Sequence, residues 1–254
     1  MTPLIVIPSR MGSSRLPGKP LADLNGRPMI LHVLDRAMEA GIGPVAVACA
    51  EEEIAAAVRA AGGTAILTDP DLPAGTDRVH AALGVLDPEI KYNAVVNLQG
   101  DLPTIPPDMI NAVLKPLRSP TFDIATLVAE ITTEEERTSP AVVKAVCAFS
   151  DPSGTVAPAL YFSRAAVPSG PGPLWHHIGI YAYRRTALDR FVSLPESPLE
   201  KREKLEQLRA LEAGMRIGCA RVEHAPFGVD TPDDLERARA VLRNWSSSVT
   251  EPSA

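Results

Sequence analysis

The sequence predicts an α/β fold in which helices cover both faces of a mixed, mostly parallel sheet. In the first half of the chain, short apolar runs alternate with segments of helical periodicity, which is typical of parallel sheets. From residue 123 onward, apolar runs follow one another with little helix between them. The 254 residues, 45% hydrophobic and 22% charged, can bury a sizeable core. We expect one domain over residues 1–245, with a β-rich lobe at 123–185 and a disordered tail at 246–254.

Turn and capping residues set the expected elements of the first half. Pro28 stands near the first position of one helix and Gly41 just past its end. Thr76 is a candidate cap for a later helix. The expected strands are 4–7, 45–50, 65–67 and 94–98, and the expected helices are 28–40, 51–61, 76–86 and 106–117.

The second half is expected to contain more strand, with helices returning near its end. Thr231, Pro232 and the two aspartates after them form a strong helix start, because a capping hydroxyl precedes proline and first-turn carboxylates. The expected strands are 124–131, 141–149, 159–162, 178–183 and 217–222, and the expected helices are 186–192, 198–213 and one opening at Thr231.

Composition excludes several classes of protein. A net charge of −6 argues against a broad nucleic-acid surface but allows a local basic pocket. No segment has the length of an apolar membrane span, and the first residues do not form a signal peptide. Cys49, Cys147 and Cys219 have no metal-ligand or disulfide spacing, and each lies in an apolar run. We expect three buried thiols in a reducing, cytoplasmic environment.

The loop after the first apolar run is the most informative segment. It carries Arg10, Arg15 and Lys19 together with Gly12 and Gly18, so cations and backbone N–H groups can converge on a polyanion. Its position beyond the carboxyl end of a first strand is where open α/β sheets bind ligands. These observations predict a nucleoside triphosphate site.

This loop does not match the P-loop of NTPases. Five residues separate Gly12 from Gly18, whereas the P-loop has four between its glycines. Pro20 directly after Lys19 also disfavours helix at the lysine. Lys19 is therefore expected to reach phosphate from an extended loop.

Two carboxylates are candidate ligands for a divalent cation. Asp101 follows an apolar strand, and Asp230 stands just before the last helix. Carboxylates from two strand ends can share magnesium with phosphate oxygens. Each also has a structural reading, Asp101 as a turn former and Asp230 as part of a helix cap.

The loop resembles the signature of 3-deoxy-manno-octulosonate (Kdo) cytidylyltransferases, the CMP-Kdo synthetases of the sugar nucleotidyltransferase superfamily. The likeness continues in family order over nearly the whole chain. The blocks that carry it are Pro8-Ser9-Arg10-Met11-Gly12-Ser13-Ser14-Arg15-Leu16-Pro17-Gly18-Lys19-Pro20-Leu21, Gly75-Thr76-Asp77-Arg78, Val96-Asn97-Leu98-Gln99-Gly100-Asp101, Tyr161-Phe162-Ser163-Arg164, His177-Ile178-Gly179-Ile180-Tyr181, Leu205-Glu206-Gln207-Leu208-Arg209 and Gly228-Val229-Asp230-Thr231-Pro232.

The resemblance implies a Rossmann-like fold, a sugar-binding and dimerisation lobe, a homodimer, and transfer of CMP from CTP to the anomeric hydroxyl of Kdo for lipopolysaccharide biosynthesis. It implies Mg²⁺ on Asp101 and Asp230 and catalytic roles for Lys19 and Arg10. The implied CTP-binding residues are Pro8, Arg10, Gly12, Arg15, Lys19, Gly75, Thr76 and Arg78, and the implied sugar-binding residues are Gln99, Arg164, His177, Glu206 and Gln207.

Three positions depart from the family pattern. Leu102 replaces a glutamate, a strand that often ends in Thr-Asp here ends in Cys49-Ala50, and the segment 168–175 is short. A related cytidylyltransferase acting on 8-amino-Kdo or sialic acid is the alternative reading. A non-catalytic nucleotide-binding module is disfavoured, because Lys19, Asp101 and Asp230 are all present.

Overall fold

The structure is a computed structural model that describes residues 1–13, 15–150 and 154–249. Contacts divide it into two compact units, each built from separate stretches of the chain. The N-terminal unit contains Leu4–Ile90, Asn97–Pro107 and the chain from Pro226 onward. The central unit contains Met1–Pro3, Lys91–Val96 and Asp108–Ala225, and so includes the expected lobe at 123–185.

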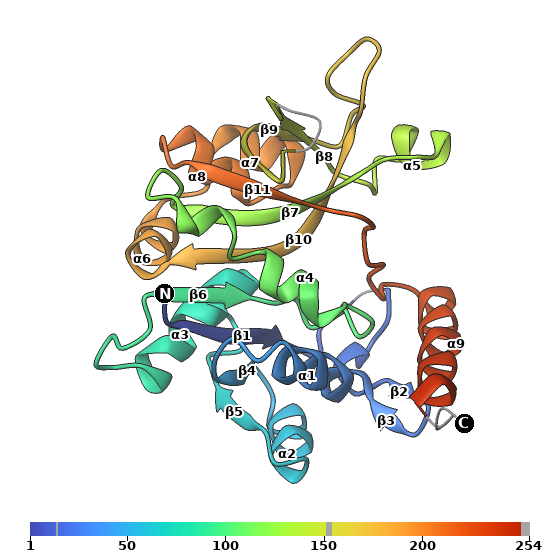
Figure 1. Ribbon diagram of the computed structural model, residues 1–254. Coiled ribbons are helices and arrows are strands. Elements are labelled where there is room, and N and C mark those ends of the chain that lie inside the picture. Colours follow the sequence, from blue (N-terminus) through green and yellow to red (C-terminus); the bar gives the residue numbers. More distant parts are fainter. Residues whose placement is uncertain (14, 151–153, 250–254) are drawn as a thin grey trace. The chain divides into compact units, whose positions relative to one another are not determined.

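The N-terminal unit is a parallel sheet with helices packed around it (Figure 1). Its sheet has β1 and β5 on either side of β4, and both pairings are parallel. Its strands are β1 (Pro3–Ser9), β4 (Val45–Cys49) and β5 (Thr64–Leu67), with a hairpin of β2 (Asp23–Leu24) and β3 (Arg27–Pro28). Its helices are η1 (Lys19–Leu21), α1 (Met29–Glu39), α2 (Glu52–Ala60), α3 (Gly75–Leu86) and α9 (Pro232–Val249).

Two glycines let the chain pass close to β1. A Cβ on Gly75 would lie 3.3 Å from the Pro8 ring, and a Cβ on Gly100 would lie 3.0 Å from the Pro8 carbonyl oxygen. Ile7 and Pro8 are neighbours in β1, so their side chains lie on opposite faces of the strand. A Cβ on Gly100 would lie near the side chains of both Ile7 and Ile30 of α1, so Ile7 faces α1. Helices α1 and α3 therefore cover opposite faces of the fully buried β1.

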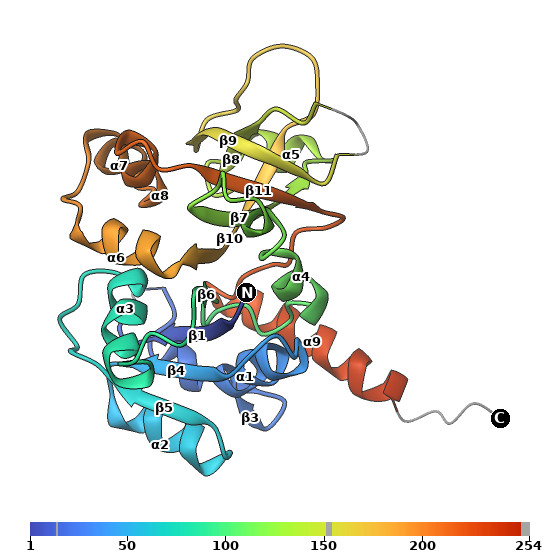
Figure 2. The same cartoon turned by 60° about the vertical axis from the view of Figure 1, so that its left-hand side comes forward.

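The central unit contains a small mixed β-barrel (Figure 2). Strands run in the order β10-β7-β11-β9-β8, and β8 also pairs with β10, so the five close on themselves. The β11–β7 pairing is parallel, while the other four are antiparallel. The strands of this unit are β6 (Ala94–Asn97), β7 (Ile124–Glu130), β8 (Lys144–Cys147), β9 (Val156–Ser163), β10 (Trp175–Arg184) and β11 (Ile217–Val222). Its helices are α4 (Pro107–Ala112), η2 (Pro116–Arg118), α5 (Glu134–Thr138), α6 (Arg185–Ser193), α7 (Pro198–Glu203) and α8 (Gln207–Glu212).

The fold is thus mixed α/β, with parallel pairing prevailing in the N-terminal unit and antiparallel pairing in the central unit. No described helix is long and apolar enough to cross a membrane. Cys49 and Cys219 are buried as expected, while Cys147 is half-buried.

Several expected element boundaries need correction. The expected helix 198–213 is broken, because Lys204 has a left-handed backbone with φ of 56° between α7 and α8. Thr76 does not cap α3, since the cap is Ala74 and Thr76 is a buried residue of the helix. The expected helix 106–117 ends at Ala112, and α5 was not predicted. Helix α9 extends to Val249 through the start of the expected tail, and residues 250–254 lie outside the described part.

Candidate active site

The basic loop, which we define as the segment that carries Arg10, Arg15 and Lys19, begins at the carboxyl end of β1 and leads into η1. Backbone hydrogen bonds join its two ends. The N–H of Gly18 donates to the Met11 carbonyl at 3.3 Å, and the N–H of Lys19 donates to the Leu16 carbonyl at 3.2 Å. Gly18 has φ of 69°, a left-handed conformation that suits glycine and turns the chain into η1. The loop therefore presents Lys19 at the start of a short helix rather than on a long one.

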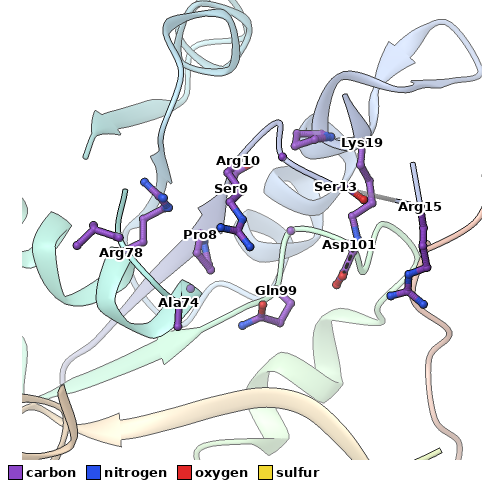
Figure 3. A pocket seen from close by; sticks show the side chains of 15 residues that line it. Pro8, Ser9, Arg10, Ser13, Arg15, Lys19, Ala74, Arg78, Gln99 and Asp101 are labelled. Carbon is purple, nitrogen blue, oxygen red and sulfur yellow. Dashed lines mark hydrogen bonds and ion pairs between the residues drawn. The ribbon is translucent and has the colours of Figure 1, made fainter. Parts of the chain in front are cut away.

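A cavity of about 360 Å³ opens beside this loop, within the N-terminal unit. In Figure 3 the side chains of Arg10, Arg15 and Lys19 surround it, and Lys19 reaches Asp101. These three cations and Arg78, which also lines the cavity, suit an anionic ligand of several charges. The lining residues are Pro8, Ser9, Arg10, Gly12, Ser13, Arg15, Lys19, Pro20, Leu72, Ala74, Gly75, Arg78, Gln99, Gly100 and Asp101.

Lys19 joins the two aspartates that the sequence singled out. Its Nζ donates to Asp101 Oδ2 at 2.9 Å and to Asp230 Oδ1 at 3.1 Å. Burial disfavours the charged ammonium, but the two carboxylates outweigh that effect and raise the pKa of Lys19 above its ordinary value. Arg15 adds an ion pair, with its Nη2 lying 3.0 Å from Asp230 Oδ2. Residues 211 positions apart thus form one charged cluster.

Local backbone contacts bring the two carboxylates to the same place. The N–H of Val229 donates to the carbonyl oxygen of Asp101 at 2.9 Å, which ties the segment before α9 to the segment after β6. Asp234 Oδ2 then accepts from the N–H groups of Asp230 and Thr231 at 3.1 and 2.9 Å. The helix start predicted at Thr231 is confirmed, and it holds the backbone of Asp230.

The two carboxylates fit a divalent cation that also binds substrate oxygens. Asp101 and Asp230 place one oxygen each within 3.1 Å of the same nitrogen, so both can reach one cation. Among the described residues, no three His, Cys, Asp or Glu side chains form a metal-binding group by themselves. Two carboxylates completed by phosphate oxygens and water match the preference of Mg²⁺.

The other end of the cavity is built by α3 and the segment after β6. Arg78 is 2% exposed, and its guanidinium donates to Thr68 Oγ1 at 2.5 Å and to the Asp69 carbonyl at 3.0 Å. Burial lowers its pKa, and neighbouring Glu51 opposes that shift. Asn97 Nδ2 donates to Thr76 Oγ1 at 3.2 Å. Arg78 therefore shapes the wall by holding the turn before α3.

Gln99 lies in the N-terminal unit with the candidate CTP residues. Its Nε2 donates to Asn97 Oδ1 at 2.9 Å, and its side chain lines the cavity (Figure 3). The sequence grouped Gln99 with four sugar candidates that lie in the central unit. The structure thus places Gln99 beside Gly75 and Arg78 in the cavity.

Arg164 and His177 are engaged within the central unit. The Arg164 guanidinium donates to the carbonyls of Glu203, Pro140 and Lys204 at 3.0, 3.0 and 3.4 Å. The His177 ring lies 3.1 Å through Nε2 from the Thr126 hydroxyl. Burial, with a smaller effect of His176, lowers the pKa of His177 to about 3. Both side chains thus have structural contacts of their own.

Glu206 and Gln207 stand at the start of α8 and differ in environment. Gln207 is 4% exposed, and its Nε2 has no hydrogen-bond partner among the described residues. Glu206 is half-buried and acts electrostatically on Tyr181. An unpartnered buried amide is uncommon, which marks Gln207 as a candidate for binding a polar ligand.

Sequence reasoning missed two residues that support the cavity. Glu51 accepts a hydrogen bond from the N–H of Met11 in the basic loop, and Asp234 holds Asp230 as described above. Asp234 was read only as a first-turn carboxylate. Glu51 had one available signal, its place next to Ala50, the position at which this strand often ends in aspartate in the related family.

Comparisons with known proteins agree on one family. A family model described as cytidylyltransferase matches residues 4–217. A 3-deoxy-manno-octulosonate cytidylyltransferase of Paramagnetospirillum magneticum is 63% identical over 243 residues, covering 96% of this chain and 98% of the relative. That of Parvibaculum lavamentivorans is 63% identical over 244 residues, covering 96% and 94%. The solved structure of a CMP:2-keto-3-deoxy-manno-octonic acid synthetase complexed with CTP is 41% identical, with a TM-score of 0.86, and covers 96% of this chain and 100% of that one.

Proposed function

The chain belongs to the cytidylyltransferase family, and from that premise we propose that it transfers CMP from CTP to the anomeric hydroxyl of Kdo. The products are CMP-Kdo and pyrophosphate. The observation that carries the proposal is the cluster of Lys19, Asp101 and Asp230, in which Lys19 and Asp101 line a cavity together with three arginines. The names of the relatives and the CTP complex of the solved structure support the choice of nucleotide and sugar.

The proposed chemistry needs positioning and charge stabilisation rather than a covalent intermediate. The anomeric oxygen attacks the α-phosphorus, the bond to the β-phosphate oxygen breaks, and negative charge grows on the α-phosphate and on pyrophosphate. Arg10 and Arg15 would hold the triphosphate, and Lys19 would donate to the α-phosphate and the leaving group. The backbone contacts at Met11, Gly18 and Lys19 would position these charges before the reaction.

Asp101 and Asp230 would hold Mg²⁺ in this proposal. The ion supplies Lewis acidity to the phosphate and the attacking hydroxyl. Lys19 contacts the carboxylate oxygens that would hold the metal, so it would give up part of those contacts when the metal binds. The triphosphate offers the ammonium a new set of anionic oxygens.

The nucleotide would contact Pro8, Gly12, Gly75 and Arg78 on the cavity wall, whereas Thr76, the other proposed CTP residue, is 2% exposed and does not line the cavity. Gly75 approaches Pro8 closely enough that a side chain there would narrow the cavity. The Thr76 hydroxyl accepts from Asn97, so Thr76 would support the cavity wall through that contact. Gln99, which lines the cavity beside them, stays a proposed sugar contact.

The remaining sugar contacts are proposed in the central unit. The unpartnered amide of Gln207 supports that residue most directly. Arg164, His177 and Glu206 follow from the family resemblance, and the Arg164 guanidinium, which has five N–H donors and three carbonyl acceptors, would donate its other N–H groups to the Kdo carboxylate. A Rossmann-like arrangement, a homodimer formed through the β-rich lobe and a cytoplasmic location complete the proposal.

A pyrophosphate-release assay tests the function. CTP and UTP are each combined with Kdo, 8-amino-Kdo and sialic acid in the presence of Mg²⁺. The proposal predicts the highest kcat/KM for CTP with Kdo. A higher kcat/KM with 8-amino-Kdo or sialic acid would contradict Kdo as the sugar substrate. Pyrophosphate release from UTP equal to that from CTP would contradict CTP as the specific nucleotide.

A further inference from the structure

Glu51 holds the backbone of the basic loop from outside the loop. Its Oε1 and Oε2 accept from the N–H of Met11 at 3.1 and 3.0 Å. Glu51 is the residue before α2, yet its carboxylate makes no capping bond to that helix within the described structure. The carboxylate is therefore committed to the loop, 40 residues earlier in the chain.

Met11 is fixed at both of its backbone polar groups. Glu51 accepts from its N–H, and its carbonyl accepts from the N–H of Gly18 at 3.3 Å. Met11 lies between Arg10 and Gly12, and Gly18 directly precedes Lys19. The hydrogen bond at the Met11 N–H therefore positions the backbone at the start of the loop. Through the bond between Met11 and Gly18, it also positions the backbone next to Lys19. Charge-assisted hydrogen bonds of this kind are stronger than neutral ones.

The charge of Glu51 also suits its surroundings. Among the charged neighbours of Arg78, Arg10 lowers its pKa, whereas Glu51 and Asp69 raise it. Glu51 therefore offsets the repulsion between two arginines on the cavity wall before an anionic ligand arrives. The same carboxylate orders the loop and balances its cations.

We propose that Glu51 is a positioning residue that fixes the triphosphate loop in its binding conformation through the Met11 N–H. The proposal rests on the function proposed above, since it assigns the triphosphate to this loop. Without the Glu51 carboxylate, the Met11 N–H loses its acceptor and the loop must be ordered by the nucleotide itself. Ordering on binding reduces affinity.

The test uses variants that separate Glu51 from its neighbour. Glu51→Ala removes the acceptor, and Glu51→Gln keeps one amide oxygen without the charge. Glu52→Ala is the matched control, because Glu52 is the next residue, is 61% exposed and pairs with Arg59 at 2.8 Å. The readouts are CTP binding by calorimetry and hydrogen exchange at the Met11 amide.

The expected result is about tenfold weaker CTP binding in Glu51→Ala, on the scale of one charge-assisted hydrogen bond. Glu51→Gln should lose less, and Glu52→Ala should match the wild type. The Met11 amide should exchange faster in Glu51→Ala alone, while the melting temperature changes little.

Wild-type CTP affinity and slow Met11 exchange in Glu51→Ala would overturn the proposal, as would an equal loss in Glu52→Ala. Absence of CTP binding by the wild type would instead overturn the proposed function. The exchange of the Met11 amide would then still decide whether Glu51 orders the loop.

Discussion

Replacing Lys19 with alanine removes the cation that joins Asp101 to Asp230. The Lys19 side chain is 15% exposed, whereas those of Asp101 and Asp230 are 32% and 42% exposed. Water can therefore reach both carboxylates in the variant, and screening limits the loss in unfolding free energy to roughly 1 kcal/mol for each partly exposed pair. That loss should be full below pH 10.5 and disappear as pH rises through the raised pKa of Lys19.

Turnover should fall much further than stability. A preorganised charged donor to a developing oxyanion contributes about 3–4 kcal/mol, so kcat should drop by roughly 10²–10³-fold. The assay is pyrophosphate release at saturating CTP and Kdo, with thermal unfolding measured beside it. Lys19→Met serves as the control, since it keeps most of the alkyl stem and loses the charge. Turnover within a few-fold of the wild type in both variants would refute the role assigned to Lys19.

Metal binding gives Lys19→Ala a second, opposite readout. Because the ammonium contacts Asp101 Oδ2 and Asp230 Oδ1, it competes with a divalent cation for those oxygens. Nucleotide-free Lys19→Ala should bind Mn²⁺ more tightly than the wild type in calorimetry. Weaker binding in the variant would mean that Lys19 supports the metal site rather than competing for it.

The remaining predictions concern the metal, the sugar and pH. Asp101→Asn and Asp230→Asn should each nearly abolish activity, and the double variant should be little worse, because residues acting as a unit are not additive; additive losses would argue against a shared ion. Arg164→Ala should weaken Kdo binding with CTP binding unchanged, and should also lower the melting temperature by breaking three carbonyl contacts; equal losses for both ligands would contradict a sugar contact. Glu200→Gln should cost about 3 kcal/mol or more near neutral pH, since Glu200 and Arg209 form a buried pair at 2.6 Å. Burial acts against the charged Glu200, but Arg209 lowers its pKa, so the charge-dependent part of the cost should be full above about pH 4.5 and be lost as pH falls through that lowered pKa; denaturant unfolding at a series of pH values checks this. His177→Phe should flatten the loss of stability between pH 6.5 and 3, because burial lowers the pKa of His177 to about 3 and only the unfolded chain gains a proton in that range; an unchanged pH profile would show that the folded and unfolded chains protonate His177 equally.

Local patterns predicted the elements that carry their own signals. The expected helix 28–40 is α1 within one residue at each end, since Pro28 and Gly41 bound an apolar face. The start of α9 is also confirmed, because the Thr231 hydroxyl and the Asp234 carboxylate form a reciprocal cap. Such interactions depend on neighbours in sequence, which is why sequence reasoning can find them.

Long-range contacts explain what the sequence did not predict. Nothing near Lys204 in the sequence marks the left-handed residue that separates α7 from α8. The closure of β8 onto β10 depends on pairing across about 30 residues, and periodicity alone does not specify partners. Likewise, the contact of Glu51 with Met11 joins a helix start to a loop 40 residues away.

In the candidate site, too, local sequence signals predicted some residues, whereas long-range contacts could not be predicted. Arg10, Arg15 and Lys19 were predicted from one continuous loop, and their place on one cavity follows from that continuity. The meeting of Asp101 with Asp230 was predicted from strand ends, and Lys19 does contact both. The engaged guanidinium of Arg164 could not be anticipated, because its three acceptors are backbone carbonyls without a sequence signature.

The most direct test of the central claim follows the α-phosphorus of CTP. The protein is incubated with Kdo, Mg²⁺ and CTP labelled with ³²P at either the α or the γ position, and the products are separated by anion exchange. Nucleotidyl transfer predicts that the α label moves to CMP-Kdo and that the γ label leaves in pyrophosphate. A γ label on the sugar, or an α label that remains in CDP, would contradict the account and indicate phosphoryl transfer instead.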